Sequence, residues 1–162
     1  MKNFFLKTAY LLGEESKCVS RHVGAVIAHD KRIISTGYNG TPPGFQNCNE
    51  HFPDYNEKLS RDHHHLWSKT YEVHAEMNAV NFAAKHGISI EGAEMYTILE
   101  PCDDCLKNMI AAGIKKIYYV YSYDKATQDN QLWHKIDHEQ VSNYELIHWI
   151  DQQEMRNLPN GK

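Results

Sequence analysis

The sequence predicts an α/β domain in which helices cover a mixed central sheet. Helix-length and strand-length segments alternate along the chain in the order helix, strand, strand, helix, strand, helix, strand, with a variable end. Gly87 and Gly113 follow two of the helical segments as stop signals. The 162 residues suit one domain with a full core. We therefore expect a single domain over residues 1–155, followed by a mobile tail at 156–162.

The first elements are a helix and a β-hairpin. Residues 3–17 form the expected helix. An apolar run at 23–28 and a second extended run at 32–38 flank the polar turn at 29–31, which is typical of a hairpin. Residues 39–65 then carry several glycines and prolines without sustained periodicity, so we expect a long ordered loop there. Loops of this length in compact domains are usually functional, and we treat residues 46–72 as an ordered insertion.

The second half of the chain alternates helices and strands. A helix is expected from His74 to about Lys85, a strand over 95–99, a helix over 102–112 and a strand over 116–121. The remaining segments are less distinct. Residues 127–135 are ambiguous, and residues 144–150 are expected to form a last strand.

Several of these segments end at one edge of the predicted sheet. Ligands of open α/β sheets bind outside the carboxyl ends of the strands. The strand at 95–99 ends at a Pro-Cys motif, and the strand at 116–121 ends near Tyr123. Because the hairpin is antiparallel, Asn39 at the end of its second strand lies beside Arg21 at the start of its first. We expect these positions to meet.

Composition narrows the class of protein. The formal net charge is −4 and the pI is about 6.2, which gives no sign of a nucleic-acid-binding surface. No apolar run approaches the length of a membrane span, and the N-terminus lacks the regions of a signal peptide. We expect a cytoplasmic protein. In that reducing compartment its four cysteines indicate metal ligands or core thiols before disulfides.

Two motifs supply three zinc ligands and one further carboxylate. His74-Ala75-Glu76 is followed, 25 residues after Glu76, by Pro101-Cys102-Asp103-Asp104-Cys105. One imidazole (His74) and two thiolates (Cys102 and Cys105) leave a fourth tetrahedral position open, as in a catalytic zinc site. A structural zinc, or a chance co-occurrence, is the alternative, but a structural site normally shows four protein ligands. The pattern is typical of zinc-dependent nucleobase deaminases.

The chemistry of such a site assigns Glu76 a role. Zinc lowers the pKa of bound water from about 15.7 towards 7, so hydroxide is available at neutral pH. Glu76 would accept the water proton, donate it to the ring nitrogen and then deliver a proton to the departing ammonia.

With the segment Gly37-Tyr38-Asn39-Gly40-Thr41-Pro42-Pro43-Gly44 added to these motifs, the chain resembles the deoxycytidylate (dCMP) deaminases, particularly the bacteriophage type, from about residue 5 to 125. The resemblance implies a three-layer α/β/α cytidine deaminase-like fold with about five strands. It implies hydrolytic deamination of dCMP to dUMP for thymidylate synthesis, by a homohexamer that dCTP with magnesium activates and dTTP inhibits. The location would be the cytoplasm, that of the host if the protein is phage-encoded.

The resemblance also implies roles for single residues. Asn39 would contact the deoxyribose, Tyr123 would lie near the sugar-phosphate, and Ala75 and the backbone near Leu99 would seat the ring. The allosteric nucleotide would use a separate set of residues: Gly37, Tyr38, Gly40 and Thr41. Each of these roles has an alternative. The segment at 37–44 could be a glycine turn that closes a hairpin, with Asn39 as a turn residue whose hydrogen bonds are satisfied. Tyr123 could be a surface aromatic residue at a strand end.

A monophosphate requires a cation or backbone donors. Arg21 is the first candidate because it falls at the expected sheet edge, and His22 and Lys125 come next. Each of these could equally be a solvated surface charge.

A second zinc site is expected near the same edge. Cys18 precedes the hairpin and Cys48 follows it, and His64 and Glu72 come just before the catalytic helix. Phage-type members of the resembled family carry an additional zinc on cysteines and a histidine at matching positions, which favours His64 over its neighbours. Glu72 is the expected fourth ligand, although a different histidine could replace it. The alternative is two buried thiols beside an exposed histidine run.

Other functions would leave different features in the sequence. A polynucleotide-editing deaminase should show a basic groove with stacking aromatics, whereas the insertion at 46–72 has more acidic than basic residues. A free cytidine deaminase would lack the Gly-Tyr-Asn-Gly segment. A dual dCMP/dCTP enzyme would differ in its contacts with the additional phosphates, which the sequence does not assign, so this alternative stays open. A non-enzymatic zinc protein would have no need of Glu76.

Overall fold

The computed structural model describes residues 1–123 and 130–157, and its centre is a five-stranded mixed sheet in the order β2-β1-β3-β4-β5. β1 pairs antiparallel with β2 and with β3, whereas β3, β4 and β5 run parallel. The strands are β1 (Gly24–His29), β2 (Arg32–Tyr38), β3 (Glu94–Leu99), β4 (Lys116–Tyr121) and β5 (Asp137–Gln140). The predicted mixed sheet of about five strands is therefore confirmed.

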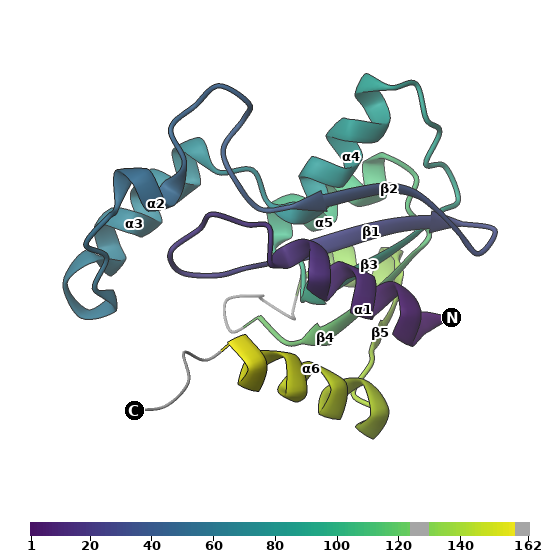
Figure 1. Ribbon diagram of the computed structural model, residues 1–162. Coiled ribbons are helices and arrows are strands. Elements are labelled where there is room, and N and C mark those ends of the chain that lie inside the picture. The colour runs from purple at the N-terminus through teal and green to yellow at the C-terminus, as the bar shows by residue number, and fades with distance from the viewer. Residues whose placement is uncertain (124–129, 158–162) are drawn as a thin grey trace.

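Helices cover both faces of this sheet, which makes the three layers visible in Figure 1. The buried residues separate by face, as the alternation of side chains along a strand requires. Val26 and Tyr96 point into the cluster that contains the buried residues of the first and last helices, while Ile27 and Met95 point into the other cluster. The covering helices are α1 (Lys2–Gly13) and α6 (Tyr144–Asn157) on one face, and α4 (Ala75–Lys85) and α5 (Asp103–Ala111) on the other.

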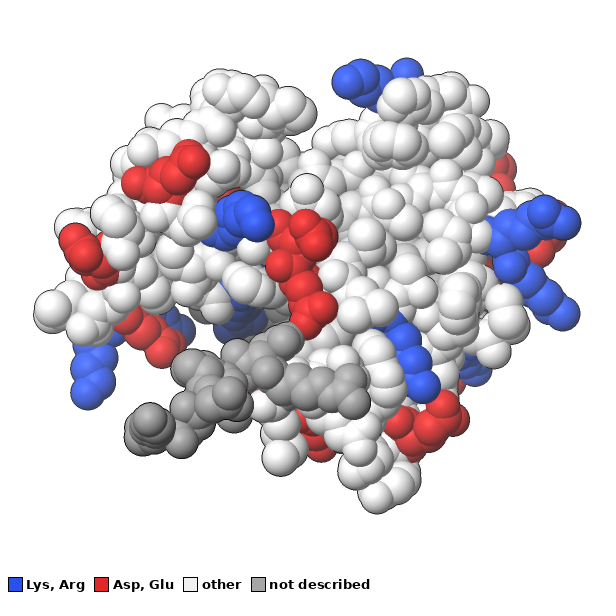
Figure 2. All heavy atoms as spheres, viewed as in Figure 1, with Lys and Arg blue, Asp and Glu red and all other residues white. Residues whose placement is uncertain are grey.

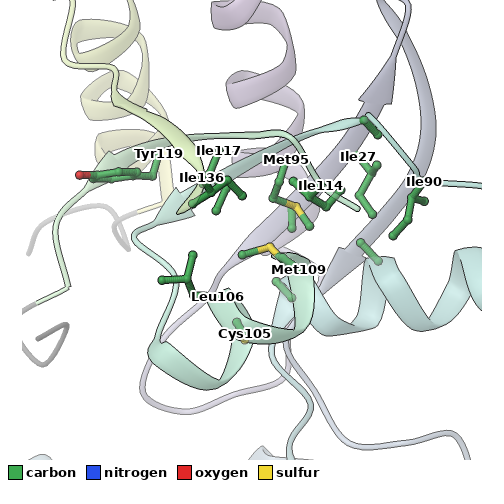
Figure 3. Close-up of a cluster of buried hydrophobic side chains, with 14 of the residues drawn as sticks. Ile27, Ile90, Met95, Cys105, Leu106, Met109, Ile114, Ile117, Tyr119 and Ile136 are labelled. Atoms are coloured by element: carbon green, nitrogen blue, oxygen red, sulfur yellow. The ribbon is translucent and has the colours of Figure 1, made fainter. Parts of the chain in front are cut away.

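The α5 side of the core fixes the helix that carries the cysteine motif. Leu106 and Met109, three residues apart on α5, are fully buried and point toward the sheet residues Met95 and Ile117 in Figure 3. Burying a side chain of this size stabilises the fold by about 1.5–3 kcal/mol. This packing holds α5 against the sheet, and only residues 100–102 separate its first residue, Asp103, from the end of β3.

The hairpin follows the sequence prediction. His29 pairs with Arg32, so the loop has two residues, Asp30 and Lys31, with φ angles of 49° and 62°. Positive φ at both loop residues is the backbone twist that suits a two-residue hairpin.

The expectation of a long loop over residues 39–65 is wrong for its second half. A short helix α2 (Cys48–His51) and a 15-residue helix α3 (Glu57–Tyr71) occupy it, and the Asn56 side chain caps α3 by accepting a hydrogen bond from the Lys58 amide. His64 is the buried residue of α3. Because a histidine takes the place of an aliphatic core residue, the apolar period that reveals a helix is missing.

The expectation of a strand over 144–150 is also wrong, because this segment begins α6. Leu146 and Ile150 are fully buried and lie four residues apart, which is a helical spacing, and the Asn143 side chain accepts from the Leu146 amide. The last strand is instead β5, whose four residues Asp-His-Glu-Gln offer no apolar signal.

Smaller boundaries differ as well. The first helix ends at Gly13 rather than at residue 17, the segment at 127–135 contains a 3-10 helix (Gln131–Lys135), and α6 continues past the expected domain end to Asn157. The rest of the expected tail, residues 158–162, and Lys125 lie outside the described residues. Among the described helices, none combines the length and the apolar character that a membrane crossing requires.

Candidate active site

Two helix N-termini bring the three predicted zinc ligands together. His74 is the N-cap residue of α4, Cys102 is the N-cap residue of α5, and Cys105 lies in the first turn of α5. The Nδ1 atom of His74 is 3.5 Å from Sγ of Cys102 and 3.4 Å from Sγ of Cys105. All three ligand atoms lie within 4.8 Å of one another.

These distances fit a tetrahedral zinc ion. Bonds of about 2.3 Å to sulfur and about 2.05 Å to nitrogen place the two ligand atoms about 3.6 Å apart at the tetrahedral angle. The observed sulfur–nitrogen distances of 3.4 and 3.5 Å agree with that value. The three side chains are therefore already arranged as zinc ligands.

Hydrogen bonds within the cluster shift the pKa of all three side chains. A hydrogen bond from the Cys105 thiol lowers the pKa of Cys102 to about 4, and the hydrogen bond with Cys102 raises the pKa of His74 to about 9. The neighbouring thiolate also raises the pKa of Cys105. The lowered pKa of Cys102 favours the thiolate, which is the form of a cysteine that binds a metal cation.

Glu76 lies beside this cluster and belongs to the first turn of α4. It is only 4% exposed, and its Oε2 atom is 3.9 Å from Sγ of Cys105. Burial raises the pKa of this carboxyl above its usual range. A buried carboxyl next to a three-ligand metal site is placed to exchange protons with a molecule held there.

The cluster opens into a pocket of about 640 Å³, a size typical of small-molecule sites. The segments that were predicted to meet at one sheet edge do meet here, because Arg21, Asn39, Leu99 and Tyr123 all line this pocket, as does Ala75. His22 is not among the lining residues, since its Nε2 atom is 2.8 Å from the carbonyl oxygen of Cys18.

Asn39 is 8% exposed and bridges the two ends of the hairpin. Its Oδ1 atom accepts from the Val23 amide at 2.9 Å, and its Nδ2 atom donates to the Arg21 carbonyl at 2.9 Å. Asn39 therefore has the hydrogen bonds of the turn residue that the sequence analysis gave as an alternative, and its side chain also lines the pocket.

Tyr123 lines the pocket beside Arg21. Its amide donates to the buried carboxylate of Glu100 at 2.9 Å, and the Arg21 guanidinium lies 5.2 Å from the centre of its ring. Glu100 also lines the pocket and had no role in the sequence analysis.

The residues expected to bind an allosteric nucleotide lie outside this pocket. Gly37 is buried in β2, where an added Cβ atom would lie 2.4 Å from the Ala75 carbonyl oxygen of α4. Gly40 forms two backbone hydrogen bonds with Val73, immediately before His74. Tyr38 is exposed and Thr41 is half-buried at the start of the following segment, so their allosteric role stays a prediction.

A second cluster joins Cys18, Cys48, His64 and Glu72, whose ligand atoms lie within 4.8 Å of one another. Sγ of Cys18 is 3.5 Å from Nε2 of His64 and 3.5 Å from Oε2 of Glu72, and the latter two atoms are 4.0 Å apart. The structure thus brings His64, and neither adjacent histidine, to the two cysteines.

This second cluster also fits a cation. The Glu72 side chain is 3% exposed, and its Oε1 atom is buried without a hydrogen-bond partner among the described residues. Burial lowers the pKa of His64 and raises the pKa of Cys48 to about 12, so the uncharged forms of both are favoured. A buried carboxylate with an unsatisfied oxygen beside two thiols and an imidazole is a donor set that suits zinc.

Several further residues line the pocket that the sequence analysis did not assign. Those that come from α3 are Arg61, Asp62, His65, Ser68 and Lys69. The spacing of 61, 65 and 69 would have shown them on one helical face, had the segment been recognised as a helix. On the face seen in Figure 2, basic and acidic side chains are interspersed, so any charge selectivity depends on the pocket rather than on a broad field of one sign.

Fold and site together define a zinc-binding deaminase of the cytidine deaminase-like class. The chain belongs to the family described as the cytidine and deoxycytidylate deaminase zinc-binding region, whose model matches residues 1–121.

Within this family the chain is similar to phage deoxycytidylate deaminases. It is 44% identical over 149 residues to the enzyme of Enterobacteria phage T2, covering 74% of this chain and 79% of the relative. The corresponding enzyme of phage T4 is 42% identical, over 74% and 77%. A crystal structure of dCMP deaminase from the cyanophage S-TIM5, in complex with dCMP and dUMP, superposes with a TM-score of 0.70 at 33% identity, covering 86% of this chain and 96% of that one.

Proposed function

We propose that this protein catalyses the zinc-dependent hydrolytic deamination of dCMP to dUMP and ammonia. The observation that carries the proposal is a buried carboxylate, Glu76, 3.9 Å from one of three zinc-ligand side chains in a nucleotide-sized pocket. Support for this substrate comes from the phage relatives named for it and from the cyanophage enzyme crystallised with dCMP and dUMP.

His74, Cys102 and Cys105 would hold the catalytic zinc. When bound there, zinc supplies Lewis-acid chemistry that lowers the pKa of water towards 7. The hydrogen bonds of the Gly40–Val73 bridge hold the backbone next to His74, and the buried face of α5 holds Cys105, so the chain itself fixes the ligand positions.

Glu76 is the proton carrier. It takes a proton from the attacking water and gives it to the ring nitrogen as the water oxygen bonds to the amino-bearing carbon. It next takes the proton of the hydroxyl group now on that carbon and delivers it to the amino group, which leaves as ammonia as its bond to the carbon breaks and the carbonyl group forms. Its burial keeps bulk water away and favours a carboxyl that both accepts and releases a proton.

The remaining lining residues orient the nucleotide. Ala75 and the backbone at Leu99 would seat the cytosine ring, Asn39 would contact the deoxyribose and Tyr123 would lie near the sugar-phosphate. Arg21, whose guanidinium rests on the Tyr123 ring, would bind the phosphate.

A second, structural zinc would be held by Cys18, Cys48, His64 and Glu72. The unsatisfied Glu72 oxygen and the 3.5 Å contacts of Cys18 support this assignment. Such a site would fasten α3 to the segment that precedes the hairpin.

Regulation and assembly complete the proposal. dCTP with magnesium would activate and dTTP would inhibit, through Gly37, Tyr38, Gly40 and Thr41. The enzyme would act as a homohexamer in the cytoplasm, that of the host if it is phage-encoded.

The test is ammonia release from dCMP, dCTP, deoxycytidine and cytidine by zinc-loaded protein, with and without dCTP and magnesium. Fast turnover of dCMP alone, increased by dCTP, would support both the reaction and the regulation. Turnover of dCTP or of the nucleosides instead would overturn the assigned substrate.

A further inference from the structure

One wall of the active-site pocket is formed by α3, and this wall carries a row of basic side chains. Arg61, His65 and Lys69 are spaced four residues apart, so they lie on one face of the helix, and all three line the pocket. Figure 1 shows α3 standing to one side of the sheet. Arg21 lines the same pocket from the segment before β1. Cations from two separate parts of the chain therefore face one cavity.

Arg61 and Lys69 are exposed, and among the described residues neither forms an ion pair within 4.0 Å. The basic residue Lys58 lies on the same helix but does not line the pocket. Selective placement of two cations on the pocket wall indicates a site for an anion rather than a generally solvated helix face.

Most acidic groups that line the pocket already have partners. Glu100 accepts from the Tyr123 amide, Asp104 pairs with Lys107, and Glu72 and Glu76 lie in the two cysteine clusters. Asp62 is the acidic residue of the α3 wall beside the basic row.

The position of the basic row is fixed by buried residues of the same helix segment. His64 is buried against Cys18, and Glu72, at the C-cap of α3, accepts from the Ser68 hydroxyl at 2.6 Å. Because these contacts hold α3 along the stretch that carries the row, the basic side chains start from a defined position. A preorganised wall loses less conformational entropy when it binds a ligand.

We propose that Arg61 and Lys69, with His65 between them, form a phosphate-binding wall in the pocket that Arg21 also lines, and that this wall selects the 5′-phosphate of the nucleotide. The inference rests on the proposed function, since it specifies how that pocket would tell a nucleoside monophosphate from a nucleoside. Charge-assisted contacts from guanidinium and ammonium groups to phosphate are the strong class of hydrogen bond, and each lost contact weakens binding by about tenfold or more.

The experiment compares calorimetric binding of dUMP and deoxyuridine to the full zinc-loaded protein. The test variant is R61Q/K69Q, and K58Q on the same helix is the matched control. Glutamine preserves helix propensity, so the exposed substitutions leave α3 intact, which circular dichroism and zinc content verify. We expect the Kd of dUMP to rise at least about thirtyfold in R61Q/K69Q, that of deoxyuridine to change less than about twofold, and K58Q to match the unmodified protein.

An unchanged dUMP affinity in R61Q/K69Q, or an equal loss for dUMP and deoxyuridine, would overturn the phosphate-binding wall. Failure of the proposed reaction is recognised separately. If the unmodified protein does not release ammonia from dCMP but its dUMP affinity still depends on Arg61 and Lys69, the wall stands and the proposed reaction falls.

Discussion

The close approach of β2 to α4 predicts a large loss of stability from one added methyl group. A Cβ atom on Gly37 would lie 2.4 Å from the Ala75 carbonyl oxygen and 2.5 Å from the Ala79 amide nitrogen. Ordinary contacts begin near 3.5 Å, so the shortfall is about 1 Å. Both obstacles are backbone atoms, which no rotamer change can move aside. The G37A substitution therefore requires α4 to shift away from the sheet.

Overpacking in a core costs about 1–3 kcal/mol, and we expect the upper end, about 3 kcal/mol, for G37A. In a chain of this size that corresponds to a fall in Tm of about 6–12 °C. The assay is thermal and urea unfolding at a fixed zinc concentration, because bound metal itself shifts stability.

Gly40 provides the matched control, since a Cβ atom added there meets nothing within 4 Å. We expect G40A to unfold within about 0.5 kcal/mol of the unmodified protein. A G37A protein as stable as the unmodified one, or a G40A protein as unstable as G37A, would refute the close-approach argument.

Three further predictions concern the site. The E76Q variant should retain the zinc content of the unmodified protein while ammonia release falls by at least about a hundredfold, and comparable activity would rule out Glu76 as the proton carrier. The C48S variant should lose one of two bound zinc ions per chain, counted by elemental analysis after dialysis, whereas an unchanged count would remove the second zinc from consideration. The N39A variant leaves the Val23 amide without its side-chain acceptor and should cost about 1–3 kcal/mol in equilibrium unfolding, with no measurable change contradicting the structural role of this bridge.

Local patterns made the catalytic cluster and the hairpin predictable from the sequence. The three-residue spacing of Cys102 and Cys105 places both at the start of one helix. The polar run at 29–31 marks the turn, which the structure narrows to Asp30 and Lys31. The meeting of Arg21 and Tyr123 also followed, because strand order alone brings their segments to one edge.

The predictions of a loop over 39–65 and a strand over 144–150 failed because these segments depend on tertiary contacts that the local sequence pattern does not encode. In α3 the buried position is His64, whose burial follows from distant cysteines rather than from an apolar period. In α6 the apolar residues Leu146 and Ile150 lie within an aromatic-rich run that resembles a strand, although the Asn143 side chain accepts from the Leu146 amide as a helix cap does. The basic row could be recognised only once α3 was known to be a helix.

The dual use of α3 has a thermodynamic consequence. One side of this helix meets the thiols through His64 and Glu72, and its neighbouring positions Arg61 and Lys69 border the cavity. A metal ion bound by His64 and Glu72 would restrict the movement of α3 and therefore the positions that Arg61 and Lys69 can occupy. If the bound metal raises the affinity of the phosphate-binding wall for an anion by some factor, then by thermodynamic linkage the bound anion raises the affinity of the cysteine site for the metal by the same factor. The rate of metal release from this cysteine site, measured with and without nucleotide, would therefore show whether nucleotide is bound in the pocket.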